Sequence, residues 1–327
     1  MRAAQVLDYQ KALRDGLRTG FYRTYLDGFL KSVTIKSGTV SRQQDLDHLG
    51  DEWADTEIRT LEAACAFHVD REMAPLIRHA AAGLDEDFTW SKEVFPSDRG
   101  FMMFDEPLTL REVRQRTMRT AAVVWRWGSG PYGQAGVWLS MYSKWDDALD
   151  EVAVEIRERL GDSRCQSLGP LHINHVQFVP WGHNLGPANV AMDPSVAAAY
   201  AVAGDPVAAG TQSDNPLRDI YATLALMGQT VTTISDEDIT PPVARRMGKK
   251  RIPPRVVVIR LRRSAGSRQP GETMVEWAHR WVVRGHWRKQ PCGPNYSEIK
   301  VIYIAPFIKG PEGKPLIISE KVYDLRR

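Results

Sequence analysis

The chain has 327 residues, of which 43% are hydrophobic and 25% are charged, and this composition excludes a disordered or fibrous protein. No stretch approaches the roughly 20 apolar residues that a membrane span requires, and the N-terminus lacks the apolar run of a signal peptide. The three cysteines, Cys65, Cys165 and Cys292, are far apart and odd in number, which favours a reducing compartment. We therefore expect a cytoplasmic protein with no membrane partner.

The net charge of +3 conceals a strong separation of charge along the chain. Residues 241–327 contain 20 Lys and Arg against 6 Asp and Glu, a balance of +14, which leaves 23 against 34, or −11, for residues 1–240. An asymmetry of this size indicates a polyanionic partner for the basic end, and nucleic acid is the commonest one. The alternative is that the basic end docks on the acidic part of the same chain.

Residues 1–89 are predicted to form a helical unit. The stretch "DLDHLGDEWADTEIRTLEAACAFHV" has apolar residues at roughly helical spacing: Leu46, Leu49, Trp53, Ile58, Leu61 and Cys65.

Residues 90–203 are predicted to form a mixed unit of strands and helix. Four stretches bounded by Gly and Pro have the composition of strands: residues 99–107, 119–127, 135–143 and 171–182. Residues 144–160 are predicted to be a helix, with four apolar residues on one face: Leu149, Val152, Ile156 and Leu160.

Residues 216–327 are predicted to form a third unit, a helix followed by a small antiparallel sheet with a basic face. Residues 204–215 have the composition of a linker, and Asn215 followed by Pro216 is a good helix start. A second loop is expected over residues 235–254. The predicted fold class is therefore α+β.

Several stretches look like cofactor-binding or metal-binding motifs but lack the residues that would complete them. "GSGPYG", residues 128–133, formally matches a dinucleotide-binding loop, but a strand-like run follows it, so we expect a hairpin loop. His172, His175 and His183 lack the paired ligands that would complete a metal site, and we interpret them as ordinary strand and loop histidines. We predict neither a metal nor a cofactor.

Two basic segments each contain a predicted strand with one cationic face. "RRMGKKRIPPRVVVIRLRR", residues 245–263, has nine basic residues in nineteen and no acid. Its strand places Val257, Ile259 and Leu261 opposite Arg260 and Arg262.

The stretch "HRWVVRGHWRKQ", residues 279–290, follows the same two-residue period. Trp277, Trp281, Val283 and Trp287 share one face, whereas Arg280, Val282, Arg284, His286 and Arg288 share the other. The first face is expected to pack on the core and the second to bind anions.

If these two strands pair with "IKVIYIAPF", they form a sheet whose outer face carries like charges. Such a face is unfavourable without counterions, so phosphates are expected to occupy it. The predicted nucleic-acid-binding residues are Arg260, Arg262, Arg280, Arg284, Arg288 and Lys309. Exposed aromatic residues such as Trp287, Tyr296 or Tyr303 would stack on bases.

The stretches "VVVIRLRR", "RWVVRGHWRKQ" and "IYIAPFIKGPEGKPL" resemble an uncharacterised protein family of actinobacteria and their phages or mobile elements. The similarity covers roughly residues 216–327, and the stretch "DRGFMMFDEPL" shows a weaker resemblance. It implies a bacterial or phage setting and transfers no catalytic assignment. The positions that carry it are Arg284, His286, Trp287, Arg288, Pro306, Lys309 and Gly310.

Three classes of function stay open at this point. The first is binding of RNA or DNA by the basic C-terminal sheet. The second is a metal-independent, toxin-like ribonuclease in which His286 transfers protons while Arg284, Arg288 and Lys309 stabilise the developing charge. The third is an interaction module whose partner is an acidic protein.

Overall fold

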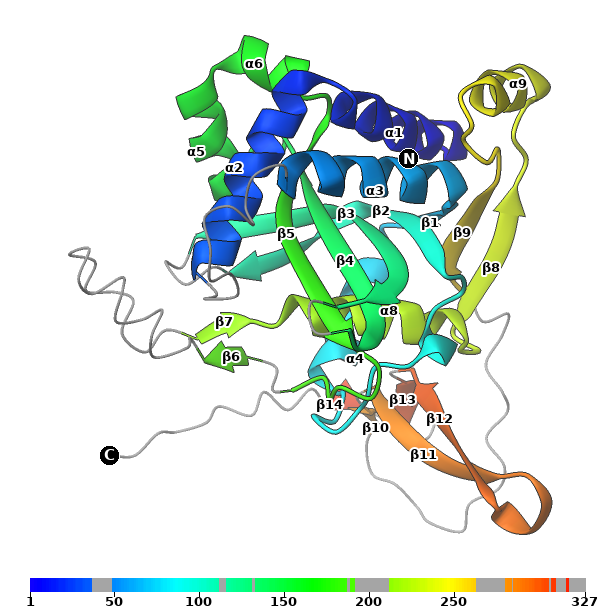
Figure 1. The fold of residues 1–327 in the computed structure, drawn as a ribbon. Helices are drawn as coiled ribbons and strands as arrows, with labels where there is room; N and C mark the ends of the chain where they lie inside the picture. The colour runs from blue at the N-terminus through cyan, green and yellow to red at the C-terminus, as the bar shows by residue number, and fades with distance from the viewer. Residues whose placement is uncertain are drawn as a thin grey trace.

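A seven-stranded mixed sheet runs through the centre of the protein (Figure 1). The structure is a computed structural model that describes residues 1–36, 49–111, 116–130, 133–186, 189–191, 212–262, 280–283, 285–305, 307–309 and 316–317. The strand order is β5-β4-β3-β2-β1-β9-β8. With helices on both faces of this sheet and a separate two-stranded antiparallel sheet, the fold is α+β, as the sequence predicts.

One half of the sheet is an antiparallel meander of four strands that the sequence predicts. They are β2 (Arg99–Arg111), β3 (Thr117–Ser129), β4 (Ala135–Lys144) and β5 (Leu171–Pro180). The "GSGPYG" stretch closes the β3–β4 hairpin, where the Gly130 amide donates to the Gln134 carbonyl at 2.8 Å. The prediction of a hairpin loop is confirmed.

The other half of the sheet contains parallel strands. β1 (Cys65–Val69) pairs in parallel with β2 on one side and with β9 (Val256–Leu261) on the other. β8 (Thr232–Glu237) pairs antiparallel with β9 and forms the edge. The predicted sheet that joins β9 to residues 279–290 is therefore wrong.

The reason lies in the burial of β9. Val256 and Val258 pack into the core on one face of the sheet, and Val257 and Ile259 pack into the core on the other face. A strand with parallel neighbours is typically buried on both faces and reads as a continuous apolar run. The "VVVI" run fits this environment, and β9 has no solvated cationic face over these four residues.

Helices cover both faces of the sheet (Figure 1). The apolar residues of six helices pack on one face: α1 (Ala3–Leu17), α2 (Gly20–Lys36), α3 (Leu49–Ala63), α5 (Glu151–Leu160), α6 (Asp162–Ser167) and α9 (Pro241–Lys249). Two helices pack on the other: α4 (Met73–Ala82) and α8 (Pro216–Met227). A search of the described helices finds none with the length and apolarity that crossing a membrane requires.

Side-chain caps decide where two helices begin. α8 begins as predicted, because the Asn215 side chain accepts a hydrogen bond from the Leu217 amide at 3.1 Å and Pro216 occupies the first helical position. α5 begins later than predicted, at Glu151, because Asp150 is its cap and accepts from the Ala153 amide at 2.9 Å. Leu149 therefore lies outside the helix and is 64% exposed.

Two further differences concern element boundaries. Cys65 begins strand β1 instead of ending the preceding helix, and residues 241–249 form helix α9 inside the stretch that we predict to be a loop. The division into units 1–89, 90–203 and 216–327 stays a prediction. The central sheet takes strands from all three segments.

The C-terminal region forms small sheets of its own. β11 (His286–Cys292) and β12 (Glu298–Ile304) make an antiparallel hairpin, as predicted. β10 (Arg280–Val283), β13 (Phe307–Lys309) and β14 (Leu316–Ile317) make a separate sheet, so the strand predicted over residues 277–288 is two strands. The remaining elements are strands β6 (Asn189–Ala191) and β7 (Gln212–Asp214) and the 3₁₀ turns η2 (Lys92–Val94) and η4 (Pro294–Tyr296).

His172 makes the stability of this fold depend on pH. Its ring is fully buried in β5 and stacks on Trp145 with centroids 3.9 Å apart, and burial lowers its pKa to about 3. The unfolded chain binds this proton near pH 6.5, so stability is lost as the pH falls from about 6.5 towards 3. His172→Gln removes this contribution.

Between pH 7 and pH 5 the wild type should lose about 2 kcal/mol more unfolding free energy than His172→Gln in urea titrations. Equal losses in the two proteins would show that His172 does not set this dependence.

Candidate nucleic-acid interface

The arginines at the end of β9 lie in different surroundings. The Arg260 guanidinium forms an ion pair with Glu237 at 3.0 Å and lies 3.9 Å from an oxygen of Asp70. Its charge is therefore balanced by two carboxylates. Arg262 follows the strand, is exposed, and lines a cavity of about 730 Å³ together with Glu72 and His79.

The hairpin carries two of the predicted site residues. His286 and Arg288 are exposed on the same face of β11, opposite Ile304 and Ile302 of β12. Arg284 lies outside the described residues, and for Arg280 and Lys309 only the backbone is described, in β10 and β13. The ribonuclease hypothesis, which combines His286 with Arg284, Arg288 and Lys309, stays a prediction.

The opposite face of the hairpin is anchored to the body, which confirms the packing role predicted for Trp287. The Trp287 indole N–H donates to the Ala80 carbonyl at 2.9 Å, and its ring contacts Tyr303 edge-on at 5.0 Å. The Tyr303 amide donates to Gln229 Oε1 at 3.0 Å, just beyond the end of α8. Trp287 is half-buried and Tyr303 is buried, so neither presents a free ring for base stacking.

In the part of the chain that the structure describes, five exposed cations gather on α9 and the turn that follows it. Val243 and Met247, four residues apart, turn towards the core, and Met247 is fully buried. The cations occupy the exposed side and the end of the helix: Arg245, Arg246, Lys249, Lys250 and Arg251. We refer to these five residues as the α9 cluster.

Contacts with α1 hold the α9 cluster in place. Arg246 forms an ion pair with Asp8 at 2.7 Å, and the buried Arg14 guanidinium donates to the Lys250 carbonyl. The helix ends in a turn in which the Ile252 amide donates to the Met247 carbonyl at 3.0 Å and Arg251 has a φ of +56°. This position usually holds Gly, so a cation is kept here at a conformational cost.

The remaining charges of the α9 cluster are not neutralised within the part of the chain that the structure describes. No described carboxylate forms an ion pair with Arg245, Lys249, Lys250 or Arg251. Cations in the last turn of a helix also interact favourably with its dipole, which explains part of their placement. Four adjacent cations without counterions nevertheless make a surface that attracts polyanions.

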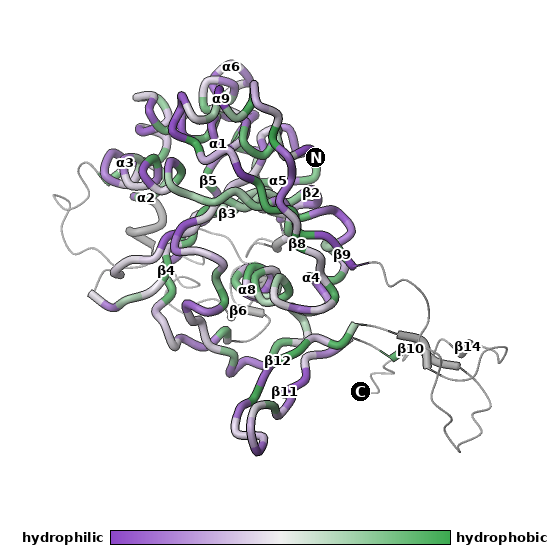
Figure 2. Tube along the Cα trace, turned by 90° about the vertical axis from the view of Figure 1, so that its right-hand side faces the viewer, coloured by the Kyte–Doolittle hydropathy of each residue, from purple (hydrophilic) through white to green (hydrophobic). Residues whose placement is uncertain are grey.

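The α9 cluster and the hairpin lie at opposite ends of the molecule. Figures 1 and 2 show α9 beside α1 at one end, and β11 and β12 projecting from the other end. The basic C-terminal region is therefore distributed over two surfaces, and the single cationic sheet predicted from the sequence does not form from the described strands.

Sequence reasoning misses α9 because residues 235–254 are predicted to be a loop, and only residues 256–261 of the basic stretch are predicted to be a strand. A signal for the helix is present: Pro241 and Pro242 follow Thr240, and proline is favoured in the first helical positions. Val243 and Met247 then follow at the four-residue spacing of a helix face.

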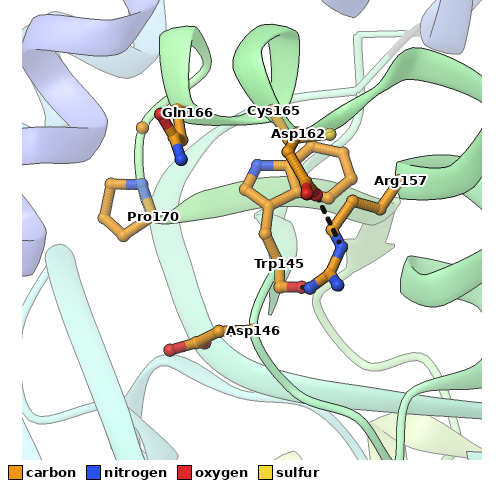
Figure 3. A pocket seen from close by; sticks show the side chains of 8 residues that line it. Trp145, Asp146, Arg157, Asp162, Cys165, Gln166 and Pro170 are labelled. Carbon is orange, nitrogen blue, oxygen red and sulfur yellow. Dashed lines mark hydrogen bonds and ion pairs between the residues drawn. The ribbon is translucent and has the colours of Figure 1, made fainter.

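A cavity of about 400 Å³ lies where the chain leaves β4 and packs against α5 and α6 (Figure 3). Its wall includes Trp145, Cys165 and an ion pair between Arg157 and Asp162 at 3.1 Å. Burial, with a smaller effect of Asp162, raises the pKa of the Cys165 thiol. A protonated, buried thiol is inert, so Cys165 is not an activated nucleophile.

No protein-family model matches the chain, and no curated protein matches it. Among solved structures, the crystal structure of AcrVA2 is similar over 93% of this chain and 93% of that chain, at 12% sequence identity and a TM-score of 0.34. A similarity at this level carries no argument about fold or function.

The anchoring of the hairpin predicts different effects for two neighbouring residues. Trp287→Ala removes a half-buried ring and its hydrogen bond, and should expose the Tyr303 amide to hydrogen exchange. Arg288→Ala changes an exposed residue and should leave that exchange rate unchanged. The reverse pattern, measured by amide hydrogen exchange, would mean that the assignment of the two faces is wrong.

Proposed function

We propose that this protein binds nucleic acid and that the α9 cluster holds the phosphates. The observation that supports this proposal most strongly is the group of four adjacent cations, Arg245, Lys249, Lys250 and Arg251, without a described carboxylate partner. Lys and Arg that neutralise phosphates release condensed counterions, which supplies most of the affinity of sequence-independent binding. The proposed setting, a phage or mobile element of actinobacteria, rests on the C-terminal signature described above.

Arginine and lysine contribute differently to such a surface. The planar Arg245 and Arg251 side chains can hold a phosphate with two parallel hydrogen bonds, whereas Lys249 and Lys250 act as point charges on flexible stems. This combination suits a backbone that presents phosphates in varying geometry. It favours binding of RNA or DNA without strong sequence preference.

The hairpin is the weaker candidate for phosphate binding. Lys289 lies 3.5 Å from Asp85, and Glu298 adds an acid to the hairpin itself. Arg288 and Lys300 are the exposed cations on it that have no described ion pair. The α9 cluster has twice as many such cations and no acid between Pro241 and Lys249.

The double variant Lys249→Ala/Lys250→Ala tests this proposal. It should weaken binding of a labelled single-stranded oligonucleotide and reduce the slope of log K against log salt by about 0.7 for each lost phosphate contact. The measurement is fluorescence anisotropy across a salt series, with RNA and DNA versions of one sequence.

The matched control is Lys289→Ala/Lys300→Ala, which removes the same charge from the hairpin at the other end of the molecule. It should change the slope much less. An affinity that does not respond to salt, or a larger effect of the hairpin variant, would contradict the proposal.

A further inference from the structure

Exposed apolar side chains gather around the β11–β12 hairpin. Five large hydrophobic side chains are exposed in the described part of the chain, and three of them, Ile234, Tyr296 and Ile299, lie on the hairpin or beside it. Tyr296 is 77% exposed and Ile299 is 69% exposed. Apolar residues grouped in this way on a surface typically mark an interaction site.

The turn at the hairpin tip holds Tyr296 in a strained conformation. The Ser297 amide donates to the Pro294 carbonyl at 3.2 Å, and the two central residues, Asn295 and Tyr296, have φ of +53° and +57°. This is a type I′ turn, which favours Asn followed by Gly. Asn295 fits, whereas Tyr296 occupies the position where Gly would be free of strain.

A groove lies on one side of the hairpin. Its volume is about 680 Å³, and its wall consists mainly of apolar side chains, including Phe88, Phe95, Leu224, Met227 and Val301. Ile234 and Ile299 lie at its exposed margin. The hairpin tip projects away from the body in Figures 1 and 2.

Charge at the groove complements charge on the hairpin. Three consecutive exposed acids, Asp85, Glu86 and Asp87, lie between the groove residues Leu84 and Phe88, and exposed Glu93 lines the groove. The hairpin presents Arg288, Lys289 and Lys300. One intramolecular pair, between Lys289 and Asp85 at 3.5 Å, shows that cations of a hairpin can pair with these acids.

We propose that two copies of this chain associate so that Tyr296, at the hairpin tip of each copy, enters the groove of the other. In a two-fold dimer both copies use the same surface, so the apolar projection of each copy can be buried in the apolar groove of the other. The cations of one hairpin then face the acids beside the partner's groove. This inference does not depend on nucleic-acid binding.

The test is sedimentation velocity of nucleic-acid-free protein over a series of concentrations. The wild type should shift from monomer to dimer as its concentration rises, and more weakly at high salt. Tyr296→Gly should raise the dimer dissociation constant by about thirtyfold or more, the effect of a central aromatic anchor. Its melting temperature should equal or exceed that of the wild type, because Gly relieves the strained turn.

Two controls accompany this variant. Leu149→Ser removes a similarly exposed apolar side chain near α5 and should leave the association unchanged. Lys249→Ala/Lys250→Ala should also dimerise normally, which separates this proposal from nucleic-acid binding. A wild type that stays monomeric at every concentration, or Tyr296→Gly that dimerises like the wild type, would overturn the proposal.

Discussion

The burial of β9 on both faces of the sheet determines where the basic C-terminal region can present its charge. The side chains of residues 256–259 are each at most 8% exposed. They alternate between the two hydrophobic cores, one on each face of the sheet. A cation within this run would lose its hydration without a partner. The cations therefore lie before this run, on α9 and the turn that follows it, and beyond the run, at Arg260 and Arg262. The buried run thus keeps the α9 cluster apart from the basic residues that follow it in the chain.

Much of the local structure can be predicted from the sequence because it depends on neighbouring residues. The four strands of the meander, the Asn215 cap of α8 and the packing face of Trp287 all follow from period and capping rules. The partners of β9 could not be predicted, because an apolar run of four residues fits a strand between β1 and β8 as well as one beside the hairpin. Pairing between distant segments depends on the whole fold.

The candidate site was harder to predict than the fold. Counting charges identifies residues 245–263 as a basic segment, but its first ten residues are predicted to be part of a loop, whereas five of its cations belong to α9 and the turn that follows. The charge of Arg260 is neutralised by Glu237, the last residue of β8, and by Asp70, which follows β1. Only the pairing of these strands brings the two acids to Arg260. Net charge therefore indicates a type of partner, and only the three-dimensional arrangement shows which cations are available to it.

Lysine footprinting with an amine-reactive reagent, in the presence and absence of a saturating oligonucleotide, tests the central claim most directly. Lys249 ends α9 and Lys250 follows it, whereas Lys289 and Lys300 lie on the hairpin at the opposite end; all four are exposed. One experiment thus compares both surfaces. We predict that the oligonucleotide protects Lys249 and Lys250 and leaves Lys289 and Lys300 reactive. Protection of the hairpin lysines alone, or of none of the four, would contradict the account.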